Sequence, residues 1–232
     1  MSDPPRKRMV RPPTGGEGPG RAAPARLEST KERTASSRAW LARQLADPFA
    51  AKARAMGYRS RAAFKLAEID ERFHLISPRA RIVDLGCAPG GWLQVASERG
   101  ARALVGIDLH PLEPLAGAVI LQGDFTEPGC GANLVAALGG APDLILSDMA
   151  PNTTGHRRTD HLRIMALIEA AADFAIESLQ PGGAFLAKAF QGGETAEVVT
   201  RLKTRFATVR HVKPKASRAE SAELYLLAQG KR

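Results

Sequence analysis

The chain has little cysteine and no long apolar run. Its two cysteines, Cys87 and Cys130, form no C-x-x-C pair and have no histidine near them in the sequence, so neither a disulfide framework nor a zinc site is indicated. No stretch approaches the ~18 apolar residues of a membrane span. The first residues contain no apolar signal sequence. We therefore expect a soluble, cytoplasmic protein that binds no metal ion and no membrane.

Negative charge is scarce at both ends of the chain, and the net charge is +9. Lysine and arginine outnumber aspartate and glutamate by nine to four in residues 1–38, seven to three in 52–79 and nine to two in 199–232. Residues 80–198 have the opposite balance, seven to fourteen. Any one basic segment could be a solvated face, but three around an acidic core favour a polyanionic partner such as nucleic acid.

Large apolar residues are also scarce in residues 1–38, which contain six prolines and four glycines. A segment of this composition cannot bury enough apolar surface to fold, so we expect a disordered, basic, Pro/Gly-rich tail over residues 1–38. Residues 39–232 are expected to form one folded domain. The 44% of hydrophobic residues in the chain is enough for one sizeable core.

A glycine-rich turn follows the short β-prone run at residues 81–83. Residues 84–92 read DLGCAPGGW, and Gly86, Gly90 and Gly91 let the backbone approach a ligand closely. Their spacing is G-x-x-x-G-G instead of the dinucleotide pattern G-x-G-x-x-G, which suits an adenosyl ligand without a pyrophosphate. S-adenosylmethionine is the leading candidate, and an ordinary turn between a strand and a helix is the alternative.

Three further strands are each followed by an aspartate. Asp108 comes 22 residues after Gly86, where an acidic side chain can bind ribose hydroxyls. Asp124 and Asp148 follow the next two strands. Each aspartate alone could be a turn former or a helix N-cap. Together they predict a ligand site at the carboxyl edge of a parallel sheet. The strands are 103–107, 118–122 and 144–147.

The remaining pattern predicts a doubly wound α/β fold with a final pair of strands. A helical region is expected over 47–73, with Asp47 as N-cap, Pro48 at the first helical position and a break at Gly57. The other expected helices are 92–99, 131–138, 160–179 and 194–205, and the other expected strands are 183–190, 206–213 and 223–229.

Several motifs together resemble the FtsJ-like ribose 2′-O-methyltransferases, and within them the bacterial enzymes that methylate a uridine in the A-loop of large-subunit ribosomal RNA. The motifs are RSRAAFKL at 59–66, DLGCAPGGW at 84–92, QGDF at 122–125, SDMAPN at 147–152, KAFQG at 188–192, SR at 217–218 and ELY at 223–225. The resemblance covers about residues 36–230, and Cys87 is a small departure from it.

This resemblance implies a Rossmann-like class I methyltransferase fold, a mostly parallel sheet with an antiparallel final strand. It implies an enzyme that uses S-adenosylmethionine to methylate the 2′-hydroxyl of a uridine in the A-loop of the peptidyl transferase centre. The expected substrate is ribosomal RNA in the large subunit during late ribosome assembly, and the expected state is a monomer. The implied catalytic tetrad is Lys65, Asp148, Lys188 and Glu223. The expected cofactor-binding residues are Gly86, Gly90, Gly91, Trp92, Asp108, Asp124, Phe125 and Asp148.

Each candidate residue also has a simpler interpretation. Lys65 could form an exposed ion pair with Glu68, three positions along a helix. Glu223 could be a charge that protects an edge strand, and Trp92 could be a core residue. Lys188, in an apolar strand, is harder to dismiss because buried lysines need a reason. It could accept the hydroxyl proton, or it could stay charged and orient the hydroxyl.

Arg59 and Arg61 form a basic cluster beside Tyr58, which suits contacts with an RNA backbone and bases, although surface arginines are the alternative. Arg218 is the third candidate for RNA binding.

Three other functions remain open. A methyltransferase for an exocyclic base nitrogen or a protein amide would carry an Asn/Asp-Pro-Pro-aromatic motif after the strand at 144–147, and residues 148–151 (DMAP) lack it. Another RNA, such as tRNA or an mRNA cap, could carry the ribose. A catalytically silent RNA-binding assembly factor would not need all four tetrad residues. A mitochondrial homologue is a further possibility, but the Pro/Gly-rich head does not form an amphipathic helix.

Overall fold

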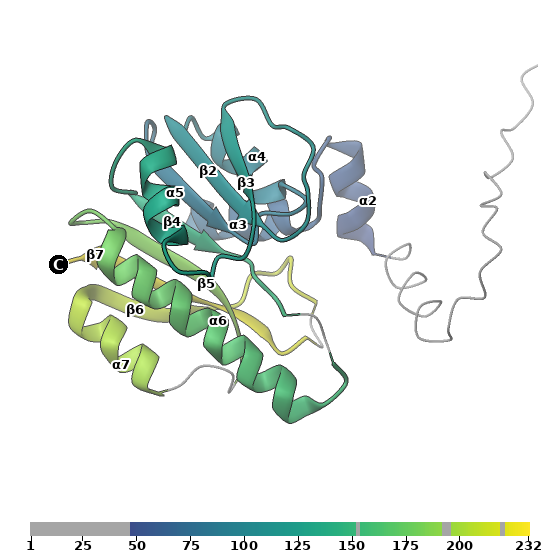
Figure 1. The fold of residues 1–232 in the computed structure, drawn as a ribbon. Coiled ribbons are helices and arrows are strands. Elements are labelled where there is room, and N and C mark those ends of the chain that lie inside the picture. The colour runs from purple at the N-terminus through teal and green to yellow at the C-terminus, as the bar shows by residue number, and fades with distance from the viewer. Residues whose placement is uncertain (1–46, 152–153, 192–195, 219–220) are drawn as a thin grey trace, which may run out of the picture. The chain divides into compact units, whose positions relative to one another are not determined.

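A seven-stranded sheet with helices on both faces forms the described part of the chain (Figure 1). The computed structural model describes residues 47–151, 154–191, 196–218 and 221–232, and the tail expected over 1–38 lies outside them. The elements in chain order are α2 (Pro48–Ala55), α3 (Ala62–Phe73), β1 (Arg81–Leu85), α4 (Gly91–Glu98), β2 (Ala103–Asp108), β3 (Ala118–Gln122), α5 (Cys130–Leu138), β4 (Leu144–Ser147), α6 (Arg157–Ser178), β5 (Ala184–Phe190), α7 (Ala196–Arg205), β6 (Phe206–Val212) and β7 (Glu223–Lys231).

The strands lie in the order β3-β2-β1-β4-β5-β7-β6. β1 to β5 are parallel to one another, whereas β7 is antiparallel to both β5 and β6. This confirms the doubly wound α/β fold, with a mostly parallel sheet and an antiparallel final strand. Because β7 runs in the opposite direction, its first residue, Glu223, pairs with the last residue of β5, Phe190. The start of β7 therefore lies at the same edge as the carboxyl ends of the parallel strands.

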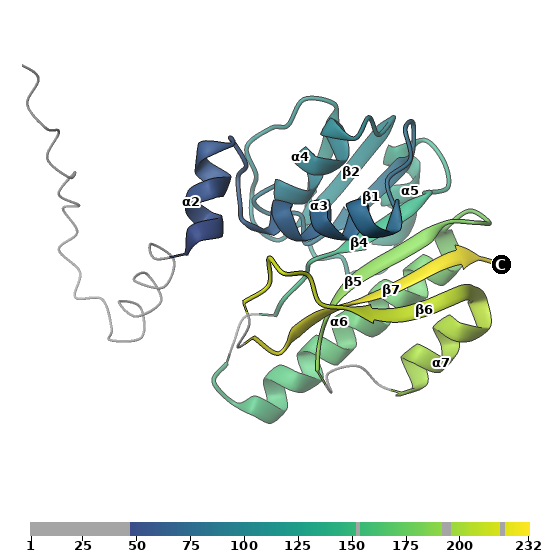
Figure 2. The same cartoon turned by 180° about the vertical axis from the view of Figure 1, so that it is seen from behind.

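Helices cover both faces of the sheet. Helices α5, α6 and α7 lie on the face seen in Figure 1, and α3 and α4 lie on the face seen in Figure 2. The buried residues of β4 alternate between two clusters, since Leu144 and Leu146 pack toward α3 and α4 while Ile145 packs toward the other helices. Burial on both faces explains why the central strands read as continuous apolar runs.

The helix boundaries confirm part of the prediction and correct one start. The Asp47 side chain caps α2, Pro48 is its first residue, and Gly57 follows the helix with a φ of +77°. The helix expected to begin at residue 160 begins at Arg157 instead. Asp160 lies in its first turn and accepts hydrogen bonds from the N–H groups of Thr154 (2.7 Å) and Gly155 (3.3 Å). No helix among the described residues is long and apolar enough to cross a membrane.

Candidate active site

Four elements bring the expected tetrad together as two ion pairs. Lys65 on α3 places its Nζ 2.7 Å from Oε1 and 2.8 Å from Oε2 of Glu223, the first residue of β7. Lys188 on β5 places its Nζ 3.1 Å from Oδ1 of Asp148 and donates to the Asp148 carbonyl at 2.5 Å. The two lysine side chains are only 10% and 9% exposed. Two lysine side chains and two carboxylates therefore lie together at the carboxyl edge of the sheet.

Tyr225 joins the two pairs, and its role was missed in the sequence. Its hydroxyl donates to Oδ1 of Asp148 at 3.0 Å, and the Nζ of Lys65 lies 5.8 Å from its ring centroid. It is also the cross-strand neighbour of Lys188 and packs against Trp92, with ring centroids 5.7 Å apart. Burial raises the pKa of Tyr225 well above its usual value, and the charges of Asp148 and Glu223 add to this. The hydroxyl therefore remains a donor.

The signal for Tyr225 was its spacing from Glu223. Side chains two residues apart in a strand share a face, so Tyr225 had to point toward the same side of the sheet as Glu223. Only the pairing of β7 with β5 places it beside Lys188.

The simpler interpretations of Lys65 and Glu223 are wrong. Glu68 does not pair with Lys65, because its carboxylate accepts the N–H groups of Lys215 (2.8 Å) and Ala216 (3.1 Å). Glu223 does not lie in an edge strand, because β7 lies between β5 and β6.

Opposing effects set the charge of Glu223. Burial alone would raise the pKa of its carboxyl group. The positive charge of Lys65, hydrogen bonds from Lys65 and Ser217, and the charge of Lys188 outweigh burial and hold this pKa below its usual value. The Ser217 hydroxyl donates to Oε1 at 2.7 Å. Glu223 is therefore an anion that holds the Lys65 side chain in place.

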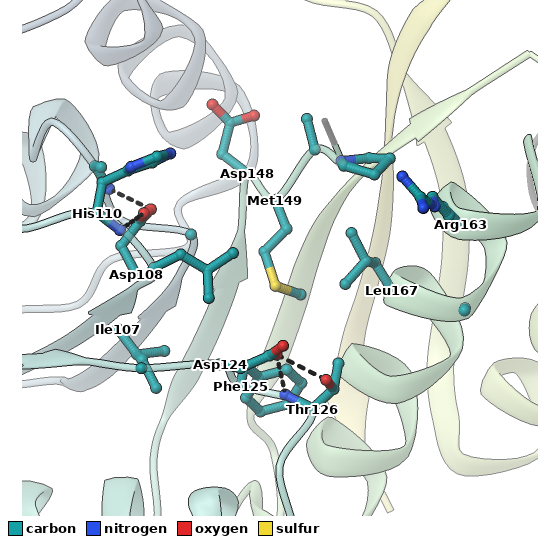
Figure 3. Close-up of a pocket in the computed structure, with 17 residues that line it drawn as sticks. Ile107, Asp108, His110, Asp124, Phe125, Thr126, Asp148, Met149, Arg163 and Leu167 are labelled. Carbon is teal, nitrogen blue, oxygen red and sulfur yellow. Dashed lines mark hydrogen bonds between the residues drawn. The ribbon is translucent and has the colours of Figure 1, made fainter. Parts of the chain in front are cut away.

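A cavity of about 550 Å³ lies beside the tetrad at the same edge of the sheet (Figure 3). Asp148 belongs to both, since it lines the cavity and pairs with Lys188. In Figure 3, Asp124 and Thr126 lie at the opposite end of the cavity from Asp148. The cavity is lined by Gly86, Ala88, Ile107, Asp108, Leu109, His110, Gly123, Asp124, Phe125, Thr126, Asp148, Met149, Ala150, Pro151, Arg163, Ala166 and Leu167.

Hydrogen bonds from nearby residues orient Asp108 and Asp124, the acids at the ends of β2 and β3. The carboxylate of Asp108 accepts the N–H groups of Ala88 at 2.9 Å and His110 at 2.8 Å, one on each oxygen. Each oxygen keeps capacity for a second donor, such as a ribose hydroxyl. Oδ1 of Asp124 accepts the hydroxyl of Thr126 at 2.7 Å and its N–H at 2.8 Å. These bonds lower the pKa of Asp124, so it presents a charged acceptor.

The glycines of the turn have different positions. Gly86 lines the cavity with a φ of +74°, and a Cβ there would lie 2.7 Å from the Cγ of Met149. A Cβ on Gly91 would instead lie 2.5 Å from Oγ of Ser60, so this glycine lets α4 pack against the residues before α3. Gly90, Gly91 and Trp92 are not among the residues that line this cavity. Their contact with a cofactor stays a prediction.

Trp92 is a core residue, as its simpler interpretation expected. Its side chain is 2% exposed, and its indole N–H donates to the carbonyl of Ala62 at 2.8 Å.

Asp84, the first residue of the glycine-turn motif, is buried without a hydrogen-bond partner for either carboxylate oxygen among the described residues. It is 0% exposed. Burial raises its pKa well above the usual value, and the charges of Asp148 and Asp108 raise it further. A neutral acid is the form that such an environment favours.

The three candidate RNA-binding arginines have different partners. The guanidinium of Arg59 donates to the carbonyls of Glu113 at 2.7 Å and Pro114 at 2.8 Å. Arg61 and Arg218 both pair with Asp47. A role in RNA binding stays a prediction for all three. Arg61 and Arg218 also line a second, smaller cavity of about 180 Å³, together with Lys65, Ser221 and Glu223.

Comparisons with known proteins agree on one family. Residues 58–231 match the model described as FtsJ-like methyltransferase. The chain is 62% identical over 222 residues to "Ribosomal RNA large subunit methyltransferase E" of Caulobacter sp. (strain K31). The aligned residues make up 96% of this chain and 98% of that protein. A protein of the same name from Hyphomonas neptunium is 53% identical over 231 residues, 99% of both chains. The crystal structure described as "a ribosomal RNA methyltransferase, putative, from Plasmodium falciparum" matches with a TM-score of 0.67 at 30% identity, over 75% of this chain and 98% of that one.

Proposed function

The chain belongs to the FtsJ-like methyltransferase family, and from this premise we propose that it methylates a ribose 2′-hydroxyl in large-subunit ribosomal RNA. S-adenosylmethionine is the proposed methyl donor. The proposed target is a uridine in the A-loop of the peptidyl transferase centre, modified during late ribosome assembly by a cytoplasmic monomer. The names of the relatives support the choice of RNA. The uridine and the A-loop follow from the sequence resemblance.

The main support for this proposal is that the four tetrad residues lie together beside the cavity. Asp148 lines the cavity and pairs with Lys188, so a ligand in the cavity and a hydroxyl beside Lys188 would lie on either side of one carboxylate. Holding two partners in this way supplies much of the rate of a displacement at carbon. A silent RNA-binding protein has no need for two buried lysine–carboxylate pairs next to a cavity.

The residues of the cavity fit an adenosyl ligand. Ile107, Phe125, Met149 and Leu167 offer apolar surface for a purine, and Asp108 offers acceptors for a ribose diol. Gly86 leaves room that a Cβ would fill. When bound there, S-adenosylmethionine supplies an electrophilic methyl group on a sulfonium centre.

The tetrad has two separable tasks in this proposal. Lys188 lies closest to the reacting ribose, where its Nζ orients the 2′-hydroxyl and either accepts its proton or stabilises the developing negative charge on oxygen. Asp148 and Tyr225 fix the position of Lys188 through the contacts at 3.1 Å and 3.0 Å on one carboxylate oxygen. The Lys65–Glu223 pair forms the other wall and holds the ribose from the side of α3.

Methylation of isolated ribosomal particles tests the proposal. Large subunits from cells that lack the enzyme are incubated with the full-length protein and labelled S-adenosylmethionine, and the modified nucleoside is mapped by mass spectrometry of RNase fragments. We expect one 2′-O-methyluridine in the A-loop. The control is the Lys188→Ala variant, which should bind the cofactor and leave the RNA unmodified.

Each other result would contradict a different part of the proposal. A methyl group on a base would refute the ribose chemistry. Modification of tRNA or capped mRNA in preference to the particles would refute the substrate. No transfer to any RNA, with intact RNA binding, would identify a silent assembly factor.

A further inference from the structure

Asp47 is a buried carboxylate whose two oxygens have different partners. Its side chain is 4% exposed. Oδ1 accepts the N–H groups of Phe49 at 3.0 Å and Ala50 at 3.3 Å, which caps helix α2. Oδ2 accepts a hydrogen bond from Nη1 of Arg61 and bonds from Nη2 (3.0 Å) and Nε (3.3 Å) of Arg218. Capping needs only one oxygen, so the contacts of Oδ2 need another explanation.

The two arginines come from distant parts of the chain. Arg61 directly precedes α3, and Arg218 lies in the connection between β6 and β7, 171 residues beyond Asp47. Arg61 also donates to the carbonyl of Ala216, and its guanidinium carbon lies 5.5 Å from the ring centroid of Phe49. Asp47 therefore joins α2, the start of α3 and the β6–β7 connection through one carboxylate oxygen.

Both arginines face the active site. They line the cavity of about 180 Å³ whose other lining residues include Lys65 and Glu223, one of the two ion pairs of the tetrad. Three basic side chains but only one carboxylate, Glu223, line this space, and counting Asp47 behind the two arginines still leaves a net positive charge. The Arg218 side chain is 34% exposed, so the space can be reached from solvent. A ribose held at the tetrad would bring its own phosphodiester group to this wall.

We propose that Asp47 is a positioning residue that holds Arg61 and Arg218 as a paired guanidinium subsite for the RNA phosphate next to the methylated ribose. The inference rests on the proposed function, because that function places a ribose at Lys65 and Glu223. Guanidinium groups bind phosphate with directed, often bidentate hydrogen bonds. Long arginine side chains lose rotamer freedom when they do so, and a carboxylate that orders them beforehand lowers this cost.

The sign of the effect separates positioning from simple electrostatics. A carboxylate on an RNA-binding surface repels phosphates, so removing its charge should strengthen RNA binding if charge were all that mattered. If Asp47 positions the arginines, the same change should weaken RNA binding although the protein becomes more positive.

The test uses Asp47→Asn in the full-length protein. The amide oxygen of asparagine can still cap α2, but the charge that faces the two arginines is removed. The matched control is Asp70→Asn. Asp70 is as buried as Asp47, at 6% residue exposure each, accepts the N–H of Ile76 at 2.8 Å and pairs with Arg99 at 3.2 Å, away from the tetrad.

Binding to large ribosomal subunits that lack the methyl group is measured by filter binding over a range of salt concentrations. We expect Asp47→Asn to weaken binding about tenfold, because the arginines no longer make directed hydrogen bonds to the phosphate. The slope of log K against log[salt] should shrink by roughly 0.7–0.9 for each phosphate that the variant no longer neutralises. S-adenosylmethionine affinity, measured by calorimetry, should stay at the wild-type value, and Asp70→Asn should leave both affinities unchanged.

A double-mutant cycle with Arg218→Gln shows whether Asp47 acts through the arginine. We expect the double variant to bind RNA as tightly as whichever single variant binds RNA less tightly. The two losses should not add, because both changes disable the same phosphate subsite. Additive losses, or tighter RNA binding by Asp47→Asn, would overturn the inference. If Asp47→Asn does not fold, Arg218→Gln alone tests the subsite. An RNA-binding salt slope in Arg218→Gln equal to that of the wild type would show that Arg218 binds no phosphate. Failure of the proposed function would show separately, as wild-type protein that binds the particles without methylating ribose.

Discussion

Replacing Lys188 by methionine tests the centre of the proposed mechanism. Methionine keeps an unbranched, largely apolar side chain, which suits a site where Lys188 is only 9% exposed. The change removes the donor that lies 2.5 Å from the Asp148 carbonyl and 3.1 Å from Oδ1 of the same residue. Asp148 keeps the hydroxyl of Tyr225 as a donor at 3.0 Å. The variant thus removes one amino group and little packing.

Two energies are expected, and they are measured separately. A positioned acid–base group contributes at least ~10² to the rate, or about 2.7 kcal/mol at 1.36 kcal/mol per tenfold. Breaking a buried ion pair costs roughly 3–5 kcal/mol of stability. The low end applies here because the Asp148 side chain is 19% exposed and keeps Tyr225. Single-turnover methyl transfer at saturating RNA and cofactor gives the first energy, and urea unfolding gives the second.

The matched control is Lys231→Met, at the opposite end of β7 from Glu223. Lys231 also donates to a backbone carbonyl, that of Leu179. Its loss should lower stability and leave the single-turnover rate unchanged. Near-wild-type transfer by Lys188→Met would refute the assignment of Lys188. Lys188→Arg then separates the two roles, because a guanidinium does not give up its proton at ordinary pH, and substantial activity in that variant would favour orientation over proton transfer.

Three other substitutions test the surroundings of the tetrad. Asp108→Ala should weaken S-adenosylmethionine binding by ~1–3 kcal/mol, because ribose hydroxyls lose their acceptor; unchanged affinity in calorimetry would remove Asp108 from the site. Tyr225→Phe keeps the ring but removes the donor to Asp148, so the free energy of unfolding should fall by ~1.5–3 kcal/mol, and an unchanged urea midpoint would contradict this. The pKa of Asp84 is raised in the folded state, so its contribution to stability is full below about pH 4 and is lost as pH rises toward the folded pKa. The side chain in the Asp84→Asn variant cannot ionise, so the stability of this variant relative to wild type should increase between pH 5 and pH 8. A difference in unfolding free energy that stays constant over this range would show that Asp84 has an ordinary pKa.

Local patterns were sufficient to predict most elements of the fold. β1 to β4 are short apolar runs, and a glycine or an aspartate ends each run or directly follows it. Each of these signals is local, so it can be found without knowing how the chain folds. Asp47 and Pro48 likewise marked the start of α2 correctly. The predicted start of α6 was wrong by three residues, because Asp160 lies in the first turn of the helix and accepts the N–H groups of Thr154 and Gly155, which precede it.

The contacts that complete the site could not be predicted from local patterns. The pairing of Lys65 with Glu223 spans 158 residues, and that of Asp47 with Arg218 spans 171. Both depend on where the last strand enters the sheet, which no local sequence signal specifies. The family resemblance predicted the four tetrad residues. The contacts of Tyr225 and of the second carboxylate oxygen of Asp47 became visible only in the structure, where β7 pairs with β5.

The position of β7 also determines when the proposed site can be completed during synthesis of the chain. β7 is made after β6 but lies between β5 and β6, so β6 has no partner until residues 223–231 have left the ribosome. Until then Lys65 lacks its carboxylate and Asp148 lacks the Tyr225 hydroxyl. A nascent chain that stops before Glu223 can form the earlier βα units, yet it presents an open sheet edge and half a tetrad. Closure of the sheet and completion of the proposed catalytic site are therefore the same folding event.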